Sequence, residues 1–288
     1  MQQNTKSRIV ISGASGFIGS TLAQSFIALG HEVVGLVRQP DNMQQNGVKY
    51  VQYAFENTEI PEVFQAGDIF IHCAYSSSTT SADKSIQATN ALLQYARRKG
   101  VKQCVFLSSI AATSKSGSSY SLEKSTLENA FQTEGDIIVR PGLVIGKGGL
   151  FYNTFRFMQR RGILPVFGDG KQFVHYIAIE NLVQIIQYLL QQKVTGTFYA
   201  VQENPLSYLD FYSAVGKKTQ RKIRIVKLPY WLILFGVNTI GKIVKLPITK
   251  DSIKGLQQIP QLDESLLKQS VYPFHLKSLS EILDDFQG

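Results

Sequence analysis

Residues 8–30, RIVISGASGFIGSTLAQSFIALG, contain the pattern that decides the fold. A short apolar run is followed by Gly13, Gly16 and Gly19 at a spacing of three, and then by a helical pattern that ends at Gly30. In a strand–turn–helix unit, such glycines let backbone N–H groups at the helix N-terminus approach a pyrophosphate. The stretch therefore predicts a dinucleotide cradle, against the alternative of a glycine turn that holds no ligand. The residues expected to contact the cofactor are Gly13, Ser15, Gly16, Phe17, Ile18 and Gly19.

Strand-like and helix-like runs alternate through the first half of the chain. Short runs rich in Val and Ile predict strands buried on both faces, and the helical patterns between them are typical of crossover connections. This order predicts an α/β protein with a Rossmann-type, doubly wound parallel sheet. The expected strands are 8–12, 32–37, 48–53, 68–74, 103–109 and 136–142, with helices that begin at Phe17, Ser81 and Tyr120.

The alternation loosens after Leu150. We therefore expect a dinucleotide-binding Rossmann domain over residues 1–150 and a smaller substrate-binding lobe over residues 151–288. Part of 175–200 is expected to return to the first domain. Helices are expected near 151–159 and 180–192.

The composition, 44% apolar and 18% charged over 288 residues, is that of an ordinary globular protein. Cys73 and Cys104 lie in strand-like runs, which predicts buried free thiols and suits a reducing compartment. The N-terminus has no secretory pattern and no stretch is long enough for a membrane span, so we expect a cytoplasmic protein. The four histidines show no metal-ligand spacing, and no metal site is expected.

The net charge of +9 is concentrated in one segment. Residues 217–254 hold ten Lys or Arg and one acidic residue, Asp251, and 227–250 is apolar around most of a helical circumference. The segment predicts either a packed helix with solvated lysines or an interfacial anchor at an anionic lipid surface, which would make the protein peripheral to the membrane. Nucleic acid is not favoured, because the segment lacks stacking aromatics and a recognised binding module.

The end of the second predicted strand indicates the type of cofactor. An acidic residue there would favour NAD by binding the 2′-hydroxyl of the adenosine ribose, but the chain has Arg38. A guanidinium can pair with a 2′-phosphate, so NADP(H) is favoured over NAD(H). A solvated surface arginine is the alternative.

A second constellation predicts acid–base chemistry. Tyr120 and Lys124 lie four residues apart, hence one turn apart on one helix face, and CVFLSS ends a strand with Ser108 and Ser109. Lowering the pKa of a phenol from about 10 to about 7 requires about 4 kcal/mol of preference for phenolate, which a nearby ammonium and a cationic nicotinamide can supply. The serine hydroxyl can bind the substrate oxygen. The alternative is a packed tyrosine beside a solvated lysine.

Together these pieces resemble the extended branch of the short-chain dehydrogenase/reductase superfamily, the NAD-dependent epimerase/dehydratase family, over roughly residues 8–190. The three glycines match its cofactor motif, Tyr120 and Lys124 match its catalytic pair, and Ser109 matches its catalytic Ser/Thr. HCA at 72–74 and RPG at 140–142 match strand ends beside the cofactor. The resemblance implies further cofactor contacts at Ala74, Ser108, Tyr120, Lys124 and Pro141.

The same resemblance implies the roles of these residues. Tyr120 exchanges a proton with the reacting oxygen, Lys124 binds the nicotinamide ribose, and a hydride passes between the nicotinamide and a sugar carbon. Family members commonly form homodimers through the helix that carries the tyrosine, so a homodimer is expected here.

The sequence departs from the family pattern at several positions. Ser85 stands where relatives often have Asn, which changes the expected active-site water chain. Val174 stands where many relatives have an arginine for the substrate pyrophosphate, and Ile110 and Ala111 replace the acidic pair of dehydratases. The loop between the catalytic serine and tyrosine is also short. The missing acidic pair argues against dehydration, Val174 argues against a nucleotide-sugar substrate, and the short loop predicts a more open pocket.

The favoured function is NADP(H)-dependent reduction of a keto group on a nucleotide-activated sugar, with Tyr120 as acid, Lys124 lowering its pKa and Ser109 orienting the carbonyl. One alternative is a nucleotide-sugar epimerase, which would retain its NAD(H). A second is a membrane-peripheral enzyme that acts on a lipid-linked or lipophilic ketone. A third is a non-catalytic dinucleotide-binding accessory protein.

Overall fold

The computed structural model describes residues 6–44, 46–56, 59–75, 82–112, 118–132, 135–167, 169–218, 222–228, 262, 266 and 271–286. The chain divides into two units. Unit 1 comprises Met1–Ser109, Glu123–Arg140 and Val183–Phe198, and unit 2 comprises Ile110–Leu122, Pro141–Leu182 and Tyr199–Gly288. Each unit is therefore assembled from stretches that are separate in the sequence.

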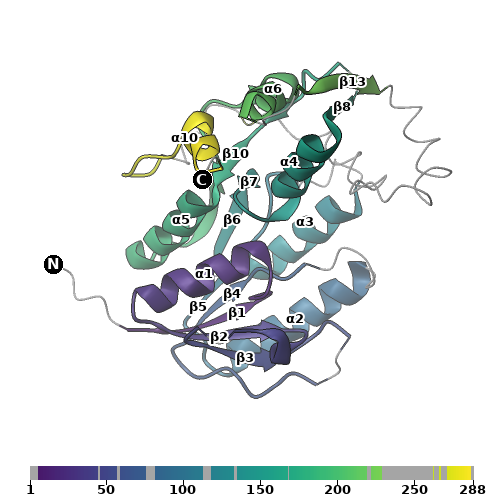
Figure 1. Cartoon of the computed structure of the whole chain (residues 1–288). Helices are drawn as coiled ribbons and strands as arrows, with labels where there is room; N and C mark the ends of the chain where they lie inside the picture. Colours follow the sequence, from purple (N-terminus) through teal and green to yellow (C-terminus); the bar gives the residue numbers. More distant parts are fainter. Residues whose placement is uncertain are drawn as a thin grey trace. The chain divides into compact units, whose positions relative to one another are not determined.

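A seven-stranded sheet lies at the centre of unit 1 (Figure 1). Its spatial order is β11-β6-β5-β4-β1-β2-β3, and neighbouring strands from β3 to β6 pair in parallel. The direction of winding reverses between β1 and β4, which is the doubly wound arrangement. The α/β fold expected from the sequence is confirmed. The strands are β1 (Arg8–Ser12), β2 (Glu32–Val37), β3 (Val48–Gln52), β4 (Ile69–His72), β5 (Gln103–Leu107), β6 (Ile137–Pro141) and β11 (Gly196–Ala200).

Helices α1 (Phe17–Ala28), α2 (Ala82–Arg98) and α3 (Ser119–Phe131) connect these strands. Because α1 leads from β1 to β2 and α2 leads from β4 to β5, in opposite directions across the sheet, right-handed crossovers place them on opposite faces. Both faces of β1 are therefore covered, and Ile9, Val10 and Ile11 are all fully buried. This explains why the strand is a continuous apolar run rather than an alternating one.

Three features differ from the sequence expectation or add to it. The strand β11 and a 3-10 turn η1 (Pro40–Asn42) were not expected, whereas α5 (Ile179–Gln192) forms where a helix was expected, near 180–192. Cys104 is buried in β5 as expected, whereas Cys73 follows the end of β4 and is only half-buried. Both thiols are free.

Unit 2 contains three two-stranded sheets and a set of helices. β10 pairs with β7 and β13 with β8 in parallel, whereas β12 pairs with β9 in antiparallel fashion. The elements are β7 (Leu143–Ile145), α4 (Gly149–Arg161), β8 (Ile163–Phe167), β9 (Phe173–Val174), β10 (Tyr176–Ala178), β12 (Leu206–Ser207), α6 (Tyr208–Lys218), β13 (Arg224–Leu228) and α10 (Leu279–Asp284).

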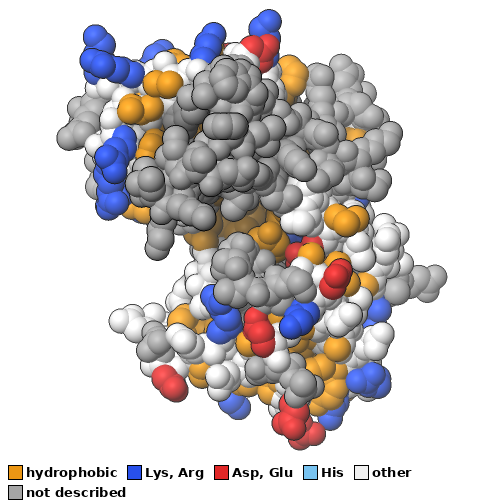
Figure 2. All heavy atoms as spheres, turned by 90° about the vertical axis from the view of Figure 1, so that its right-hand side faces the viewer, with side chains coloured by type: hydrophobic (Ala, Val, Ile, Leu, Met, Phe, Trp, Pro, Cys, Tyr) orange, Lys and Arg blue, Asp and Glu red, His pale blue; other side chains and the backbone are white. Residues whose placement is uncertain are grey.

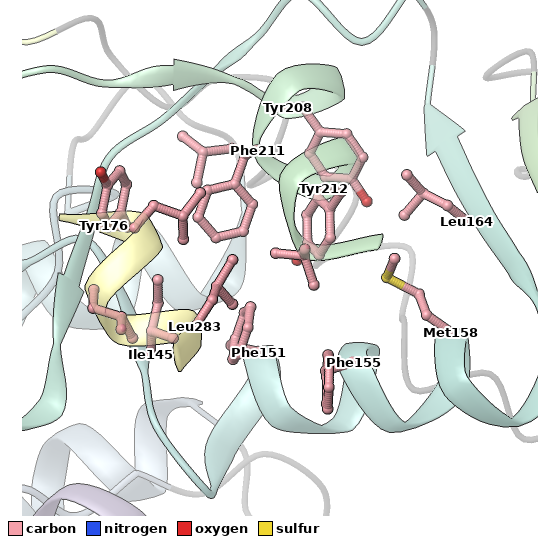
Figure 3. Close-up of a cluster of buried hydrophobic side chains, with 14 of the residues drawn as sticks. Ile145, Phe151, Phe155, Met158, Leu164, Tyr176, Tyr208, Phe211, Tyr212 and Leu283 are labelled. Carbon is pink, nitrogen blue, oxygen red and sulfur yellow. The ribbon is translucent and has the colours of Figure 1, made fainter. Parts of the chain in front are cut away.

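The core of unit 2 is formed by aromatic side chains from two of its helices (Figure 3). Phe151, Phe155 and Met158 lie on one face of α4 at helical spacing, and Phe211 of α6 packs edge-on against Phe151 at 6.1 Å between ring centroids. Leu283 of α10 belongs to the same cluster. The C-terminal helix is therefore part of the core of this unit.

Within the described ranges, no helix has both the length and the apolar character needed to cross a bilayer. Residues 229–254, which contain most of the basic apolar segment, lie outside the described residues.

Candidate functional site

The glycine turn joins β1 to α1. Gly13 follows β1 with φ at +73°, and Gly16 occupies the N-cap position of α1. The N–H of Gly16 donates to the carbonyl oxygen of Gly13 at 2.9 Å, which closes the turn. No side chain caps the helix at this residue. The N–H groups of its first turn are therefore available to bind an anion at the helix N-terminus.

Close backbone packing explains why this turn requires glycine. A Cβ atom on Gly13 would lie 2.8 Å from the Cα and N atoms of Ala74, and the positive φ already disfavours other residues. A Cβ atom on Gly19 would collide with the carbonyl oxygen of Gly13. The turn thus packs directly against the chain that follows β4.

A cavity of about 250 Å³ lies over this turn in unit 1. Gly13, Ser15, Gly16, Arg38 and Ala74 all line it, so five of the predicted cofactor residues are brought together. It lies at the carboxyl ends of β1, β2 and β4, where the winding direction reverses, which is the usual ligand position in such sheets. The other three predicted residues of the turn lie in the first turn of α1 and do not line the cavity: Phe17, Ile18 and Gly19.

Sequence reasoning missed the wall that follows β3. Tyr53, Phe55 and Glu56 line the cavity, because β3 runs parallel to β2 and ends at the same edge of the sheet. The N–H of Tyr53 donates to the carbonyl oxygen of Val37 at 2.8 Å, and burial raises the pKa of its phenol to about 12. Tyr53 is therefore neutral at physiological pH, and the charged residues that line the cavity are Arg38 and Glu56. The only local signal was the carboxyl end of a third parallel strand.

Helix α3 positions the predicted acid–base pair. Tyr120 lies in its first turn and is half-buried, and Lys124 follows one turn later with 3% of its surface exposed. The Lys124 Nζ atom donates to the carbonyl oxygen of Leu107 at 2.8 Å. It also lies 5.8 Å from the ring centroid of Tyr75, which lines the cavity. The amine is thus held at the end of β5 and is not a solvated surface lysine.

Burial sets the proton affinity of this lysine. Desolvation lowers the pKa of Lys124 to about 8, while the nearby Glu123, Cys73 and Glu128 act in the opposite direction. Lys124 therefore still carries its proton at neutral pH. A buried ammonium one helical turn from a phenol is the arrangement that favours a phenolate.

A buried network fixes the strand end next to Ser109. The Oγ atom of Ser108 donates to Oε1 of Glu128 at 2.5 Å, and Arg140 donates to the same carboxylate through Nε at 2.8 Å and Nη2 at 2.6 Å. Glu128 is 3% exposed. The network joins the end of β5, helix α3 and β6, so it fixes the backbone that carries Ser109, which is itself half-buried.

A second buried pair occupies the position where the family often has Asn. The Oγ atom of Ser85 on α2 donates to Oε1 of Glu123 at 2.7 Å, and both residues are buried. Burial raises the pKa of Glu123, and the Ser85 hydrogen bond and the Lys124 charge lower it in part. The departure at Ser85 is therefore matched by a carboxylate from α3, which sequence reasoning did not detect.

His72 has a structural environment. Its Nδ1 atom lies 2.7 Å from the Oγ atom of Ser12, and its ring packs against Phe106 and Phe131 at 5.8 and 6.2 Å between centroids. Burial lowers its pKa to about 3, so the ring is neutral at physiological pH. His72 thus ties β4 to β1 directly below the glycine turn.

Pro141 and Gly142 of the RPG strand end belong to unit 2. The carbonyl oxygen of Pro141 accepts a hydrogen bond from the N–H of Ile110 at 3.1 Å. A Cβ atom on Gly142 would collide with the carbonyl oxygen of His175, so this position requires glycine. Val174 is buried in β9, and it places no charge where relatives often have arginine.

A doubly wound sheet with a glycine turn at its switch point, an adjacent cavity and a buried lysine one turn from a tyrosine defines the class of dinucleotide-binding Rossmann enzymes. Residues 9–201 match the model of the NAD dependent epimerase/dehydratase family, and the chain belongs to this family. The resemblance found in the sequence is therefore confirmed, and the chain is an NAD(P)-dependent enzyme of the short-chain dehydrogenase/reductase superfamily.

Two curated relatives and one solved structure illustrate the similarity. A UDP-N-acetyl-alpha-D-glucosaminuronate decarboxylase of Bacillus cytotoxicus is 26% identical over 275 residues, covering 78% of this chain and 84% of the relative. An N-acetyl-alpha-D-glucosaminyl-diphospho-ditrans,octacis-undecaprenol 4-epimerase of Escherichia coli O157:H7 is 22% identical and covers 96% of this chain and 93% of the relative. The structure of a nucleoside-diphosphate-sugar epimerase from Staphylococcus aureus superposes with a TM-score of 0.74 at 16% identity, covering 96% and 99% of the two chains. This last likeness shows the shared fold.

Proposed function

We propose that this enzyme reduces a keto group of a nucleotide-activated sugar with NADPH. The observation that carries the proposal is the buried Lys124, whose ammonium lies beside Tyr75 of the cofactor cavity and one helical turn from Tyr120. Arg38 lines the same cavity. Its position supports NADPH over NADH, because a guanidinium can donate two parallel hydrogen bonds to a 2′-phosphate.

The residues present fit a dinucleotide. The glycine turn presents backbone N–H groups for the pyrophosphate. Arg38 directly follows β2, at the strand end where the adenosine ribose binds in this fold. When bound, the dinucleotide supplies the hydride. Tyr120 then donates a proton to the substrate oxygen, the Lys124 ammonium stabilises the resulting phenolate, and the Ser109 hydroxyl orients the carbonyl. One hydride and one proton convert the ketone to an alcohol.

Epimerisation is the second candidate. Both the relative from Escherichia coli and the structural neighbour from Staphylococcus aureus are named epimerases. The same three catalytic residues serve that reaction, but the enzyme must keep its cofactor through oxidation and reduction. Tightly retained NAD(H), released only on denaturation and identified by mass spectrometry, would favour the epimerase.

A lipid-linked substrate is the third candidate. The relative from Escherichia coli, which aligns over 96% of this chain, is named for a sugar carried on undecaprenyl diphosphate. This supports the alternative of an enzyme peripheral to the membrane. A cytoplasmic location, a homodimer formed through α3, and the division into a domain over 1–150 and a lobe over 151–288 remain predictions.

Tyr120→Phe tests the proposed acid. We expect it to abolish NADPH oxidation with a nucleotide-linked 4-keto sugar while the Kd for NADPH stays within about twofold, because the phenol donates the proton without carrying the phosphate contacts. Tyr95→Phe on α2 is the matched control and should keep full turnover. Turnover by Tyr120→Phe would refute the role of Tyr120. An inactive wild-type enzyme that binds NADPH would favour the non-catalytic accessory protein.

A further inference from the structure

Cations gather along one edge of unit 2 in two stretches of sequence that contain no acidic residue themselves. Residues 149–167 and 222–228, which form α4, β8 and β13 with the residues next to them, contain six Lys or Arg and no Asp or Glu. Figure 2 shows several Lys and Arg side chains that lie beside hydrophobic ones. The basic character recognised in the sequence from residue 217 onward therefore continues onto an earlier helix.

The topology brings these distant stretches together. Gly162, in the left-handed conformation at φ +64°, ends α4 and turns the chain into β8. The N–H of Arg224 donates to the carbonyl oxygen of Gly162 at 2.8 Å, and β13 then runs parallel to β8 with Arg224 opposite Ile163. Arg161 and Arg224 consequently lie at the same end of the two strands, and Lys222 lies beside Gly162.

The outer face of this ribbon combines charge with aliphatic surface. Leu164 and Val166 of β8 point into the core and are fully buried, so Ile163 points outward, and it is 38% exposed. Side chains opposite each other in a parallel pair share a face, which places Arg224 beside Ile163 and Val226, 39% exposed, further along. We call this surface the ribbon face, and it consists of Arg161, Ile163, Lys222, Arg224 and Val226.

The cations of the ribbon face are not neutralised within the described part of the chain. The ion pairs there use other residues, and examples in unit 2 are Lys218 with Asp284 and Lys277 with Asp285. None of them includes Arg161, Lys222 or Arg224. As far as the described residues show, an anionic partner would therefore meet three exposed charges that form no ion pair.

We propose that the ribbon face docks on an anionic lipid bilayer. Cations interleaved with aliphatic side chains match such a surface, because the charges bind the headgroups while Ile163 and Val226 enter the apolar boundary. A nucleic acid would instead require stacking aromatics, and none is among the five described residues that define the ribbon face. The inference goes beyond the proposed reaction and does not depend on it, since vesicle binding needs neither cofactor nor turnover.

The test is sedimentation of the full-length protein with vesicles. We expect binding to vesicles of equal parts phosphatidylglycerol and phosphatidylcholine, no binding to pure phosphatidylcholine, and weakening at high salt. Arg161→Glu with Arg224→Glu should lower the partition coefficient at least about 30-fold, because each cation near an anionic surface contributes about fivefold. Val226→Ser should weaken binding without changing its salt dependence.

The matched control reverses the same charge elsewhere. Lys49→Glu with Lys102→Glu changes two exposed cations of unit 1 and should reduce vesicle binding less than about threefold. Equal losses in both double variants, no binding by the wild type, or unchanged binding by the variant of Arg161 and Arg224 would each overturn the proposal. Tighter binding to an RNA oligonucleotide than to the vesicles at the same salt would do so too. Circular dichroism checks the fold, and turnover of a soluble nucleotide-sugar should be unchanged in both variants.

Discussion

Replacing Glu128 by Gln tests whether the buried network beside Ser109 stabilises the enzyme. The carboxylate accepts hydrogen bonds from Ser108 and from two nitrogens of Arg140 at 2.5 to 2.8 Å. Glutamine keeps the size of the side chain but removes the charge, so the guanidinium loses its counterion. Removing one partner of a buried ion pair costs about 3–5 kcal/mol.

The structure places the expected loss at the low end of this range. The Arg140 side chain is 24% exposed, so water screens part of the uncompensated charge, and we expect a loss of about 3 kcal/mol. For a chain of 288 residues this corresponds to a decrease in Tm of about 5 °C. Replacing both partners, as in Glu128→Met with Arg140→Met, should recover most of the loss, because no buried charge then remains unpaired.

Urea unfolding of the wild type, Glu128→Met, Arg140→Met and the double variant provides the assay, with Glu128→Gln measured beside them. A double-mutant cycle should give a coupling free energy of about 2 kcal/mol between Glu128 and Arg140. Glu62→Gln is the control, since its pair with Lys99 is exposed and its loss should leave the urea midpoint unchanged. A coupling below about 0.5 kcal/mol, with the m-value unchanged, would show that the network does not stabilise the fold.

Three further predictions concern the site. Burial lowers the pKa of His72 to about 3, whereas unfolded histidine titrates near 6.5, so the unfolded state binds the extra proton between these values. The free energy of unfolding, measured with urea, should fall by about 2 kcal/mol as the pH is lowered from 6.5 to 5. His72→Asn should remove this contribution to the pH dependence. Gly19→Ala should weaken dinucleotide binding at least about tenfold in calorimetry because its Cβ would collide with the Gly13 carbonyl, whereas Gly216→Ala, with only ordinary contacts, should not. Turnover should decline above a pH of about 8 as Lys124 loses its proton, and Lys124→Arg should move this decline to higher pH; an unchanged alkaline limb would contradict the role of Lys124.

The sequence predicted those parts of the fold that depend on local patterns. The strand β1, the glycine turn and α1 follow one another without interruption, so apolar period and glycine spacing were sufficient. Arg38 was found because it directly follows a recognisable strand, and Ala74 was implied by the resemblance of HCA at 72–74 to the family's strand end. The strand β11 was missed because its pairing partner, β6, ends more than fifty residues earlier, and GTFYA has no distinctive pattern of its own.

The missed site residues depend on tertiary packing. Tyr53 and Phe55 reach the cavity only because β3 pairs in parallel with β2 in one register. Glu123 and Glu128 lie on a helix whose acidic residues would ordinarily be solvated, and their burial depends on Ser85 from α2 and Arg140 from β6. No local signal distinguishes such a carboxylate from a surface one.

Equilibrium binding of NADPH, NADP+, NADH and NAD+ to the purified protein tests the central claim most directly, with Arg38→Asp measured beside the wild type. We predict that NADPH binds at least about tenfold more tightly than NADH and that Arg38→Asp abolishes this preference, because a charged hydrogen bond to the 2′-phosphate contributes about 1.5–3 kcal/mol. A preference for NADH in the wild type would contradict the assigned role of Arg38. Failure to bind any of the four dinucleotides would contradict the assignment of the cavity over the glycine turn, and with it the proposed function.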